Sequence, residues 1–132
     1  MNEVENFWKD AEVISAYTRA QALEDGFLVE LDATAKEAGF KWPVAVTRTV
    51  YEVLKPSAAL KAQGQSFAGR AWDMLAILRY ESCRASDKAV ILFAPLFVLE
   101  PGKAPRPVEF KAECGPGDDG EPVITISLPE ED

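Results

Sequence analysis

Acidic side chains gather towards the C-terminal end of this sequence, in the stretch CGPGDDGEPVITISLPEED (114–132). The acidic residues there are Asp118, Asp119, Glu121, Glu130, Glu131 and Asp132, with no Lys or Arg among them. Carboxylates are the ligands that Mg²⁺ and Ca²⁺ prefer in proteins. An EF-hand loop that starts at Asp118 is excluded, because Gly120 and Pro122 occupy positions that need oxygen ligands. A magnesium site formed by Asp118, Asp119 and Glu121 stays open as an alternative.

The same stretch has the composition of a turn between two strands. Glycine allows positive φ, proline presets φ, and Asp118–Asp119–Gly120 is a standard turn sequence. A phosphate-binding loop needs GK[ST] followed by a helix, and this stretch has no GK[ST]. The composition therefore favours a hairpin turn over a metal or phosphate site.

The sequence contains no histidine. This excludes Ser-His-Asp and Cys-His catalysis, His-ligated zinc and the usual general base near neutral pH. Two cysteines, Cys83 and Cys114, build neither a disulfide framework nor a structural zinc site. Arg79 and Arg84 lie near Cys83 in sequence, so a redox-active thiol is the alternative to an inert one. We therefore expect a non-enzymatic protein without a cofactor, with a magnesium-dependent carboxylate hydrolase as an alternative.

Charge is distributed unevenly along the chain, whose net charge is −8. Residues 1–32 carry eight acids and two bases, residues 112–132 carry seven acids and no base, and residues 33–111 carry twelve bases and seven acids. Direct nucleic-acid binding is not expected, because duplexes are bound mainly through Lys and Arg. Acidic ends attract basic surfaces of other proteins. The alternative is that these acids only keep the protein soluble.

We expect the acidic residues of the two ends to form one surface that binds a protein partner with a basic surface. This surface comprises Asp118, Asp119, Glu121, Glu130, Glu131 and Asp132, extended by Glu24, Asp25 and Glu30. Arg19 and Arg48 each follow a threonine. They are expected either to form a local cationic spot or to pair with Asp25 and Glu52.

Cap residues and apolar spacing predict the helices. Thr18 and Gln21 have the spacing of a capping box and Gly26 allows a left-handed end, so we expect a helix over 18–26. The same signals predict helices over 32–39, 47–55 and 67–84, which begin at Asp32, Thr47 and Ser66. Residues 57–65 are expected to form a loop or a fraying helical turn.

Alternating apolar residues predict strands over 27–31, 88–100, 108–114 and 122–128. Pro95 places the second of these at a sheet edge or at a bulge. The last three strands follow one another through short turns, which predicts an antiparallel meander. The fold class is α+β, with short N-terminal helices and one long core helix packed on a mostly antiparallel sheet that ends in this meander.

The length fits one domain, 1–132, in which residues 1–14 form a loosely held arm. Phe7 and Trp8 of this arm could dock on the body. No apolar run nears the roughly 20 residues that span a bilayer, and the acidic N-terminus differs from a secretory signal, so we expect a cytoplasmic protein without membrane contact.

Apolar residues also suggest a core and a second kind of interface. Trp42 and Trp72 are expected in the core. Trp72, Ala76 and Ile77 are expected to widen the apolar face of the helix over 67–84, and Arg70 is expected on its polar face. The edge of the strand over 88–99 offers a surface for a homo-oligomer, which is the alternative to charge-dependent binding.

Four segments carry a resemblance: YTRAQALEDGFLVELDATAKEAGF (17–40), PVAVTRTVYE (43–52), RAWDMLAILR (70–79) and the C-terminal stretch 114–132. Together they resemble a family of small acidic proteins of unknown function carried on bacterial plasmids, integrative elements and phages. The resemblance implies a genetic context and no catalytic residue. Mobile elements carry small acidic inhibitors of host defence, so the resemblance implies binding to a basic nucleic-acid site on a host-defence protein.

Overall fold

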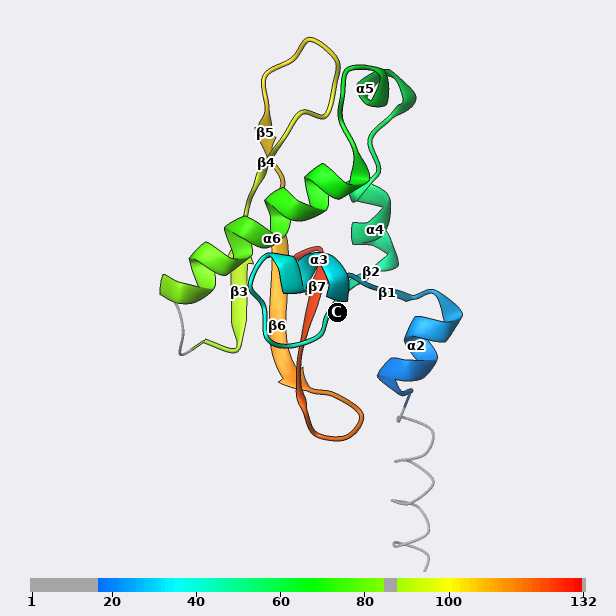
Figure 1. The fold of residues 1–132 in the computed structure, drawn as a ribbon, viewed down its shortest axis with the longest axis vertical. Helices are drawn as coiled ribbons and strands as arrows, with labels where there is room; N and C mark the ends of the chain where they lie inside the picture. The colour runs from blue at the N-terminus through cyan, green and yellow to red at the C-terminus, as the bar shows by residue number, and fades with distance from the viewer. Residues whose placement is uncertain (1–16, 85–87, 132) are drawn as a thin grey trace, which may run out of the picture.

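The computed structural model of the chain describes residues 17–84 and 88–131. The predicted arm over 1–14 lies outside the described residues. Within them, helices pack on one five-stranded mixed sheet, and a smaller two-stranded sheet extends from it (Figure 1). The predicted α+β class is confirmed. No helix of the described residues is long and apolar enough to cross a membrane.

Local capping signals set the ends of α2 (Arg19–Asp25) as predicted. The Thr18 hydroxyl accepts from the Gln21 amide, and the Gln21 side chain accepts from the Thr18 amide, each at 3.0 Å. Gly26 ends the helix at φ 83°, which a residue with a side chain rarely adopts.

Three short helices follow α2. α3 (Asp32–Glu37) has Leu31 at its N-cap, so the prediction that Asp32 caps this helix is wrong. Asp32 Oδ1 instead accepts from the Val44 amide at 2.9 Å, which ties the helix to the sheet. α4 (Arg48–Leu54) begins at Thr47 as predicted. Residues Ala58–Ala62 form a single short helix, α5, where the sequence predicted a loop or a fraying turn.

The long helix α6 (Phe67–Arg84) has the predicted bounds and buries Ala71, Met74, Leu75 and Leu78. The prediction that Trp72 and Ile77 widen this apolar face is wrong, because they are 43% and 38% exposed.

Arg70 of α6 is buried, although the sequence assigned it to the polar face. Its guanidinium donates to the Val53 carbonyl at 3.0 Å and to the Val98 carbonyl at 2.7 Å. These bonds connect α6 to the C-terminal end of α4, through Val53, and to the chain around Val98. Burial lowers the pKa of Arg70.

The main sheet has the strand order β1-β2-β7-β6-β3. Its strands are β1 (Leu28–Glu30), β2 (Val44–Thr47), β3 (Val90–Phe93), β6 (Phe110–Pro116) and β7 (Pro122–Ser127). β3, β6 and β7 form the predicted antiparallel meander. β2 was not predicted; it runs parallel to β7, with Val44 opposite Ile124 and Val46 opposite Ile126.

The predicted strand over 88–100 is interrupted near Pro95. β3 is an edge strand, as the proline suggested. Beyond the interruption, β4 (Leu96–Phe97) pairs with β5 (Arg106–Pro107) in the two-stranded sheet. The predicted strand 88–100 therefore contributes to two different sheets.

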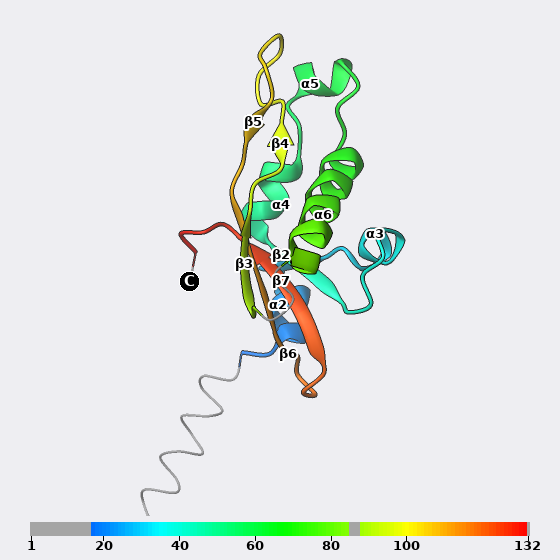
Figure 2. The same ribbon diagram turned by 90° about the vertical axis from the view of Figure 1, so that its left-hand side faces the viewer.

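The core lies between α6 and one face of the main sheet. Leu75 and Leu78 of α6 pack in one cluster with Val46, Phe110 and Ile126 of the strands. α3 lies on the same side of the sheet as α6 (Figure 2). This arrangement leaves α2 at the β1 edge, away from the core helix.

Candidate functional site

Asp118 of the C-terminal turn binds the first turn of α2. Its Oδ1 accepts from the Arg19 amide at 2.8 Å, and its Oδ2 accepts from the Ala20 amide at 3.0 Å. Both amides belong to the first turn of a helix, where no intrahelical acceptor is available. The carboxylate also suits the positive end of the helix dipole. Asp118 therefore holds the β6–β7 turn against α2.

Asp119 and Glu121 lie in the same turn. The Gly117 amide donates to the Glu121 carbonyl at 2.6 Å, and Gly120 adopts φ 82°. The Asp119 amide donates to Glu121 Oε2 at 2.9 Å. The predicted hairpin turn is thus present.

Arg19 lies between this turn and the sheet and is half-buried. Its guanidinium donates to Thr125 Oγ1 at 2.6 Å and to the Ile124 carbonyl at 3.0 Å. Burial lowers the pKa of Arg19, while the nearby carboxylates of Asp32, Asp118 and Glu121 act in the opposite direction. The positive charge of Arg19 therefore lies near three carboxylates, and its guanidinium N–H groups point inward to β7.

Three more acids belong to α2 and to β1, the edge strand beside it. Asp25, in the last turn of α2, accepts from the Tyr17 hydroxyl, and this bond raises the pKa of Tyr17 to about 12. Glu24 is exposed on the same helix. Glu30 of β1 accepts from the Asp32 amide at 3.0 Å.

We call this surface the α2 acidic edge. It comprises Glu24, Asp25, Glu30, Asp32, Asp118, Asp119 and Glu121. All but Asp32 belong to the surface predicted from the sequence.

The other predicted acids lie at the far end of β7. Six residues of strand separate the turn from the tail, which corresponds to roughly 20 Å. Glu131 Oε1 accepts from Thr47 Oγ1 at 3.0 Å, and the Glu131 carbonyl accepts from Lys111 Nζ at 2.7 Å. Glu130 is exposed, and Asp132 lies outside the described residues. The tail is therefore a separate group of acids.

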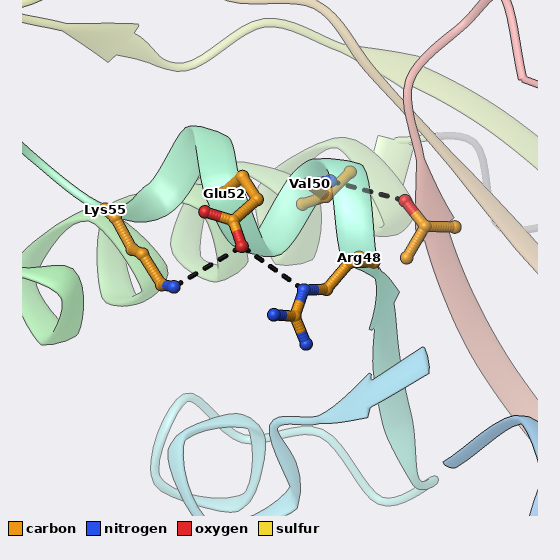
Figure 3. Close-up of polar contacts among 5 residues, drawn as sticks. Arg48, Val50, Glu52 and Lys55 are labelled. Atoms are coloured by element: carbon orange, nitrogen blue, oxygen red, sulfur yellow. Dashed lines mark hydrogen bonds and ion pairs between the residues drawn. The ribbon is translucent and has the colours of Figure 1, made fainter. Parts of the chain in front are cut away.

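Arg48 and Arg19 have different partners. Arg48 Nε pairs with Glu52 Oε1 at 3.2 Å, and Lys55 Nζ reaches the same oxygen at 3.4 Å (Figure 3). The predicted Arg48–Glu52 pair is confirmed. Arg19 bonds to β7, and the alternative pairing of Arg19 with Asp25 is wrong because Asp25 binds Tyr17.

The acids of the turn are poorly arranged for a metal. Both oxygens of Asp118 accept backbone amides, and Glu121 folds back on the Asp119 amide. Among the described residues, no group of three or more Cys, Asp or Glu side chains is placed to hold a metal ion.

A groove of about 530 Å³ lies between the C-terminal half of α6, the loop over 39–42 and the sheet. Its apolar lining comes from Phe40, Leu78, Ile91, Ala112 and Ile124. Lys41, Arg79 and Lys88 also line it. We call it the β6 groove.

Trp42 lines the β6 groove and is 45% exposed, so the prediction that it belongs to the core is wrong. The sequence places it between Lys41 and Pro43, just after the Gly39 helix end, and this loop position was the available signal. Cys114 also lines the groove and is half-buried, whereas Cys83 is exposed on α6.

Residues 4–132 match the model of a family described as a family of unknown function (DUF6573). The chain belongs to this family. No curated protein and no solved structure matches it.

Membership of DUF6573 assigns no role to any residue. The two candidate surfaces, the α2 acidic edge and the β6 groove, therefore rest on geometry and charge alone. Sequence reasoning found the acids of the first and missed the second, because its members are brought together from five separate segments.

Proposed function

We propose that this chain is a non-enzymatic acidic binding protein whose α2 acidic edge engages a basic surface on another protein. The observation that carries the proposal is the gathering of seven carboxylates around α2 and β1, with Arg19 and Arg48 as the cations beside them. The guanidinium of Arg19 donates its hydrogen bonds to β7, so its positive charge is directed into the molecule and not towards a partner.

The carboxylates of this edge come from several elements. Glu24 and Asp25 lie on α2, Glu30 on β1 and Asp32 at the start of α3, and the other three lie in the β6–β7 turn. Duplex DNA likewise presents closely spaced anions, about one per 1.7 Å of axis counting both strands. A basic site that binds a duplex would therefore also attract the anions of the α2 acidic edge, which a folded scaffold holds in place.

The resemblance to proteins of plasmids, integrative elements and phages supports a particular kind of partner. A protein carried by a mobile element acts in the cytoplasm of its host, where defence nucleases use basic sites to hold nucleic acid. The proposed partner is a host-defence protein whose basic nucleic-acid site is occupied by the α2 acidic edge.

The test compares two triple variants in affinity purification from bacterial lysate with quantitative mass spectrometry. Glu24→Gln, Asp119→Asn and Glu121→Gln together remove three of the seven negative charges of the edge and leave the Asp118 cap intact. The matched control, Glu37→Gln, Glu100→Gln and Glu109→Gln, removes the same charge elsewhere.

We expect a partner that is lost at 0.5 M salt and depleted about tenfold or more with the edge variant, but retained with the control. A partner that both variants retain equally, or that persists in high salt, contradicts the proposal.

A second candidate is a homo-oligomer formed through the free edge of β3. The Cys114 amide donates to the Ala89 carbonyl, so alternation directs the backbone groups of Val90 and Leu92 away from β6. Their side chains are 48% and 58% exposed. Association that Leu92→Lys abolishes in sedimentation equilibrium, and that Phe27→Lys leaves unchanged, would support this candidate; a monomer at all concentrations contradicts it.

A further inference from the structure

The β6 groove carries positive charge in a protein whose net charge is −8. Among the described residues, no carboxylate lies within 4.0 Å of the side-chain nitrogens of Lys41, Arg79 or Lys88. Glu113 also lines the groove, but its carboxylate pairs with Lys111 Nζ at 3.5 Å. The groove therefore combines an apolar floor with an excess of cations at its rim.

Arg79 is fixed in this position by the backbone beside it. Its Nη1 donates to the Ala38 carbonyl at 2.8 Å. A Cβ at position 39 would lie 1.7 Å from Nη1, so the guanidinium fills the space that Gly39 leaves open. Gly39 also has φ 97°, which favours glycine. Arg79 is therefore held at the C-terminal end of α3, where it lines the groove.

The occupant that suits this groove is an acidic segment with an aromatic side chain. Carboxylates would pair with the three cations, and an aromatic ring would pack on the apolar floor beside the exposed ring of Trp42. Such a segment exists in this chain: residues 1–16, MNEVENFWKDAEVISA, carry four acids, one lysine and the pair Phe7–Trp8.

The N-terminal segment joins the described fold close to the groove. Tyr17 lines a neighbouring pocket together with Glu113 and Cys114, and these two β6 residues also line the groove. Trp8 precedes Tyr17 by nine residues, which allow a reach of up to about 30 Å when extended. This reach exceeds the spacing of about 10 Å between packed sheet layers, so the segment is long enough to pass around the end of β6.

We propose that residues 3–12 of the same chain dock in the β6 groove, with Phe7 or Trp8 on its apolar floor and the neighbouring acids against Lys41, Arg79 and Lys88. Docking neutralises the cationic groove, so the outer surface becomes more uniformly acidic. The proposal rests on the groove and the N-terminal sequence and does not depend on the function proposed for the α2 acidic edge.

The test places a photo-cross-linker in the full-length chain. Trp8 is replaced by p-benzoylphenylalanine, the sample is irradiated, and the products are mapped by mass spectrometry. Equal amounts of ¹⁴N- and ¹⁵N-labelled chains are mixed beforehand, so that links within one chain are distinguished from links between two copies. We expect links to residues 39–42, 78–82 or 88–91 within one chain.

Charge variants in the same background test the electrostatic part. Lys41→Glu with Lys88→Glu is expected to lower the yield of these links about fivefold or more. Lys55→Glu with Lys61→Glu makes the same charge change at the C-cap of α4 and on α5, away from the groove, and is expected to leave the yield unchanged.

Links that join differently labelled chains would assign the groove to a second copy and overturn the proposal. Links confined to other surfaces, no links, or a yield that both charge variants lower equally would also overturn it.

Discussion

Removing the Asp118 carboxylate tests whether the C-terminal turn holds α2 in place. In Asp118→Ala the amides of Arg19 and Ala20 lose their acceptors at 2.8 and 3.0 Å. A lost N-cap costs about 0.5–2 kcal/mol, and Asp118 serves two amides at an exposed site. We expect the free energy of unfolding to fall by about 1.5 kcal/mol, with roughly half that loss for Asp118→Asn, which keeps one carbonyl oxygen.

The assay is urea unfolding followed by tryptophan fluorescence in 0.15 M salt, with a thermal melt expected to shift by about 4–8 °C. Asp119→Ala is the matched control, because it removes the same charge from the adjacent position. No hydrogen bond to the Asp119 carboxylate occurs among the described residues, so its effect should stay within about 0.5 kcal/mol.

Equal losses in the two variants would show that overall charge, and not the cap, determines the effect. An unchanged Asp118→Ala would refute the reasoning altogether. Amide exchange at Arg19 and Ala20 gives a second measurement, since both amides should exchange faster only in the Asp118 variant.

Three further predictions each concern a single residue. Tyr17 should ionise near pH 12 when its absorbance at 295 nm is followed, and Asp25→Asn should lower that pKa. Because the pKa of Tyr17 is higher in the folded state than in the unfolded state, the Tyr17–Asp25 bond stabilises the fold fully below pH 10. This stabilisation is lost as the pH rises towards 12. Gly39→Ala should cost about 1 kcal/mol more in urea unfolding than Gly64→Ala, since both have positive φ but only the first displaces a guanidinium. Arg70→Met should lower the free energy of unfolding by about 2–3 kcal/mol, because two partly buried carbonyls lose a charged donor; an unchanged midpoint would contradict this.

Features that depend on neighbouring residues could be predicted from the sequence. Thr18, Thr47 and Gly26 mark helix ends through bonds that reach only three to five residues along the chain. The bounds of α6 and the meander followed from periodicities of 3.6 and 2 in the same way.

The inner strand β2, which lies next to the edge strand β1, could not be predicted, for a physical reason. Val44, Ala45 and Val46 are all buried, because this part of the strand is covered on both faces. A strand covered on both faces loses the alternation that identifies a half-exposed strand. Pro43 directly before it weakened the signal further.

The site depends on contacts between distant parts of the chain. Asp118 binds amides that are 98 and 99 residues away in sequence, and no local pattern indicates such a bond. Arg70 is buried because two carbonyls from separate segments accept from it, so its residue type alone suggested the wrong face. The sequence showed that the chain is acidic. That the acids form two groups, the α2 acidic edge and the tail, follows only from the position of β7, which separates them.

The place of β7 in the sheet affects how the chain is made. It follows the other four strands of that sheet in sequence, yet it lies in the middle and joins β2 to β6. During translation the pairs β1–β2 and β3–β6 can each form, but they stay unconnected until residues 122–127 leave the ribosome. A polypeptide cut short before that point would leave β2 and β6 without the strand that pairs with both, and cellular proteases would encounter it as an unfolded substrate.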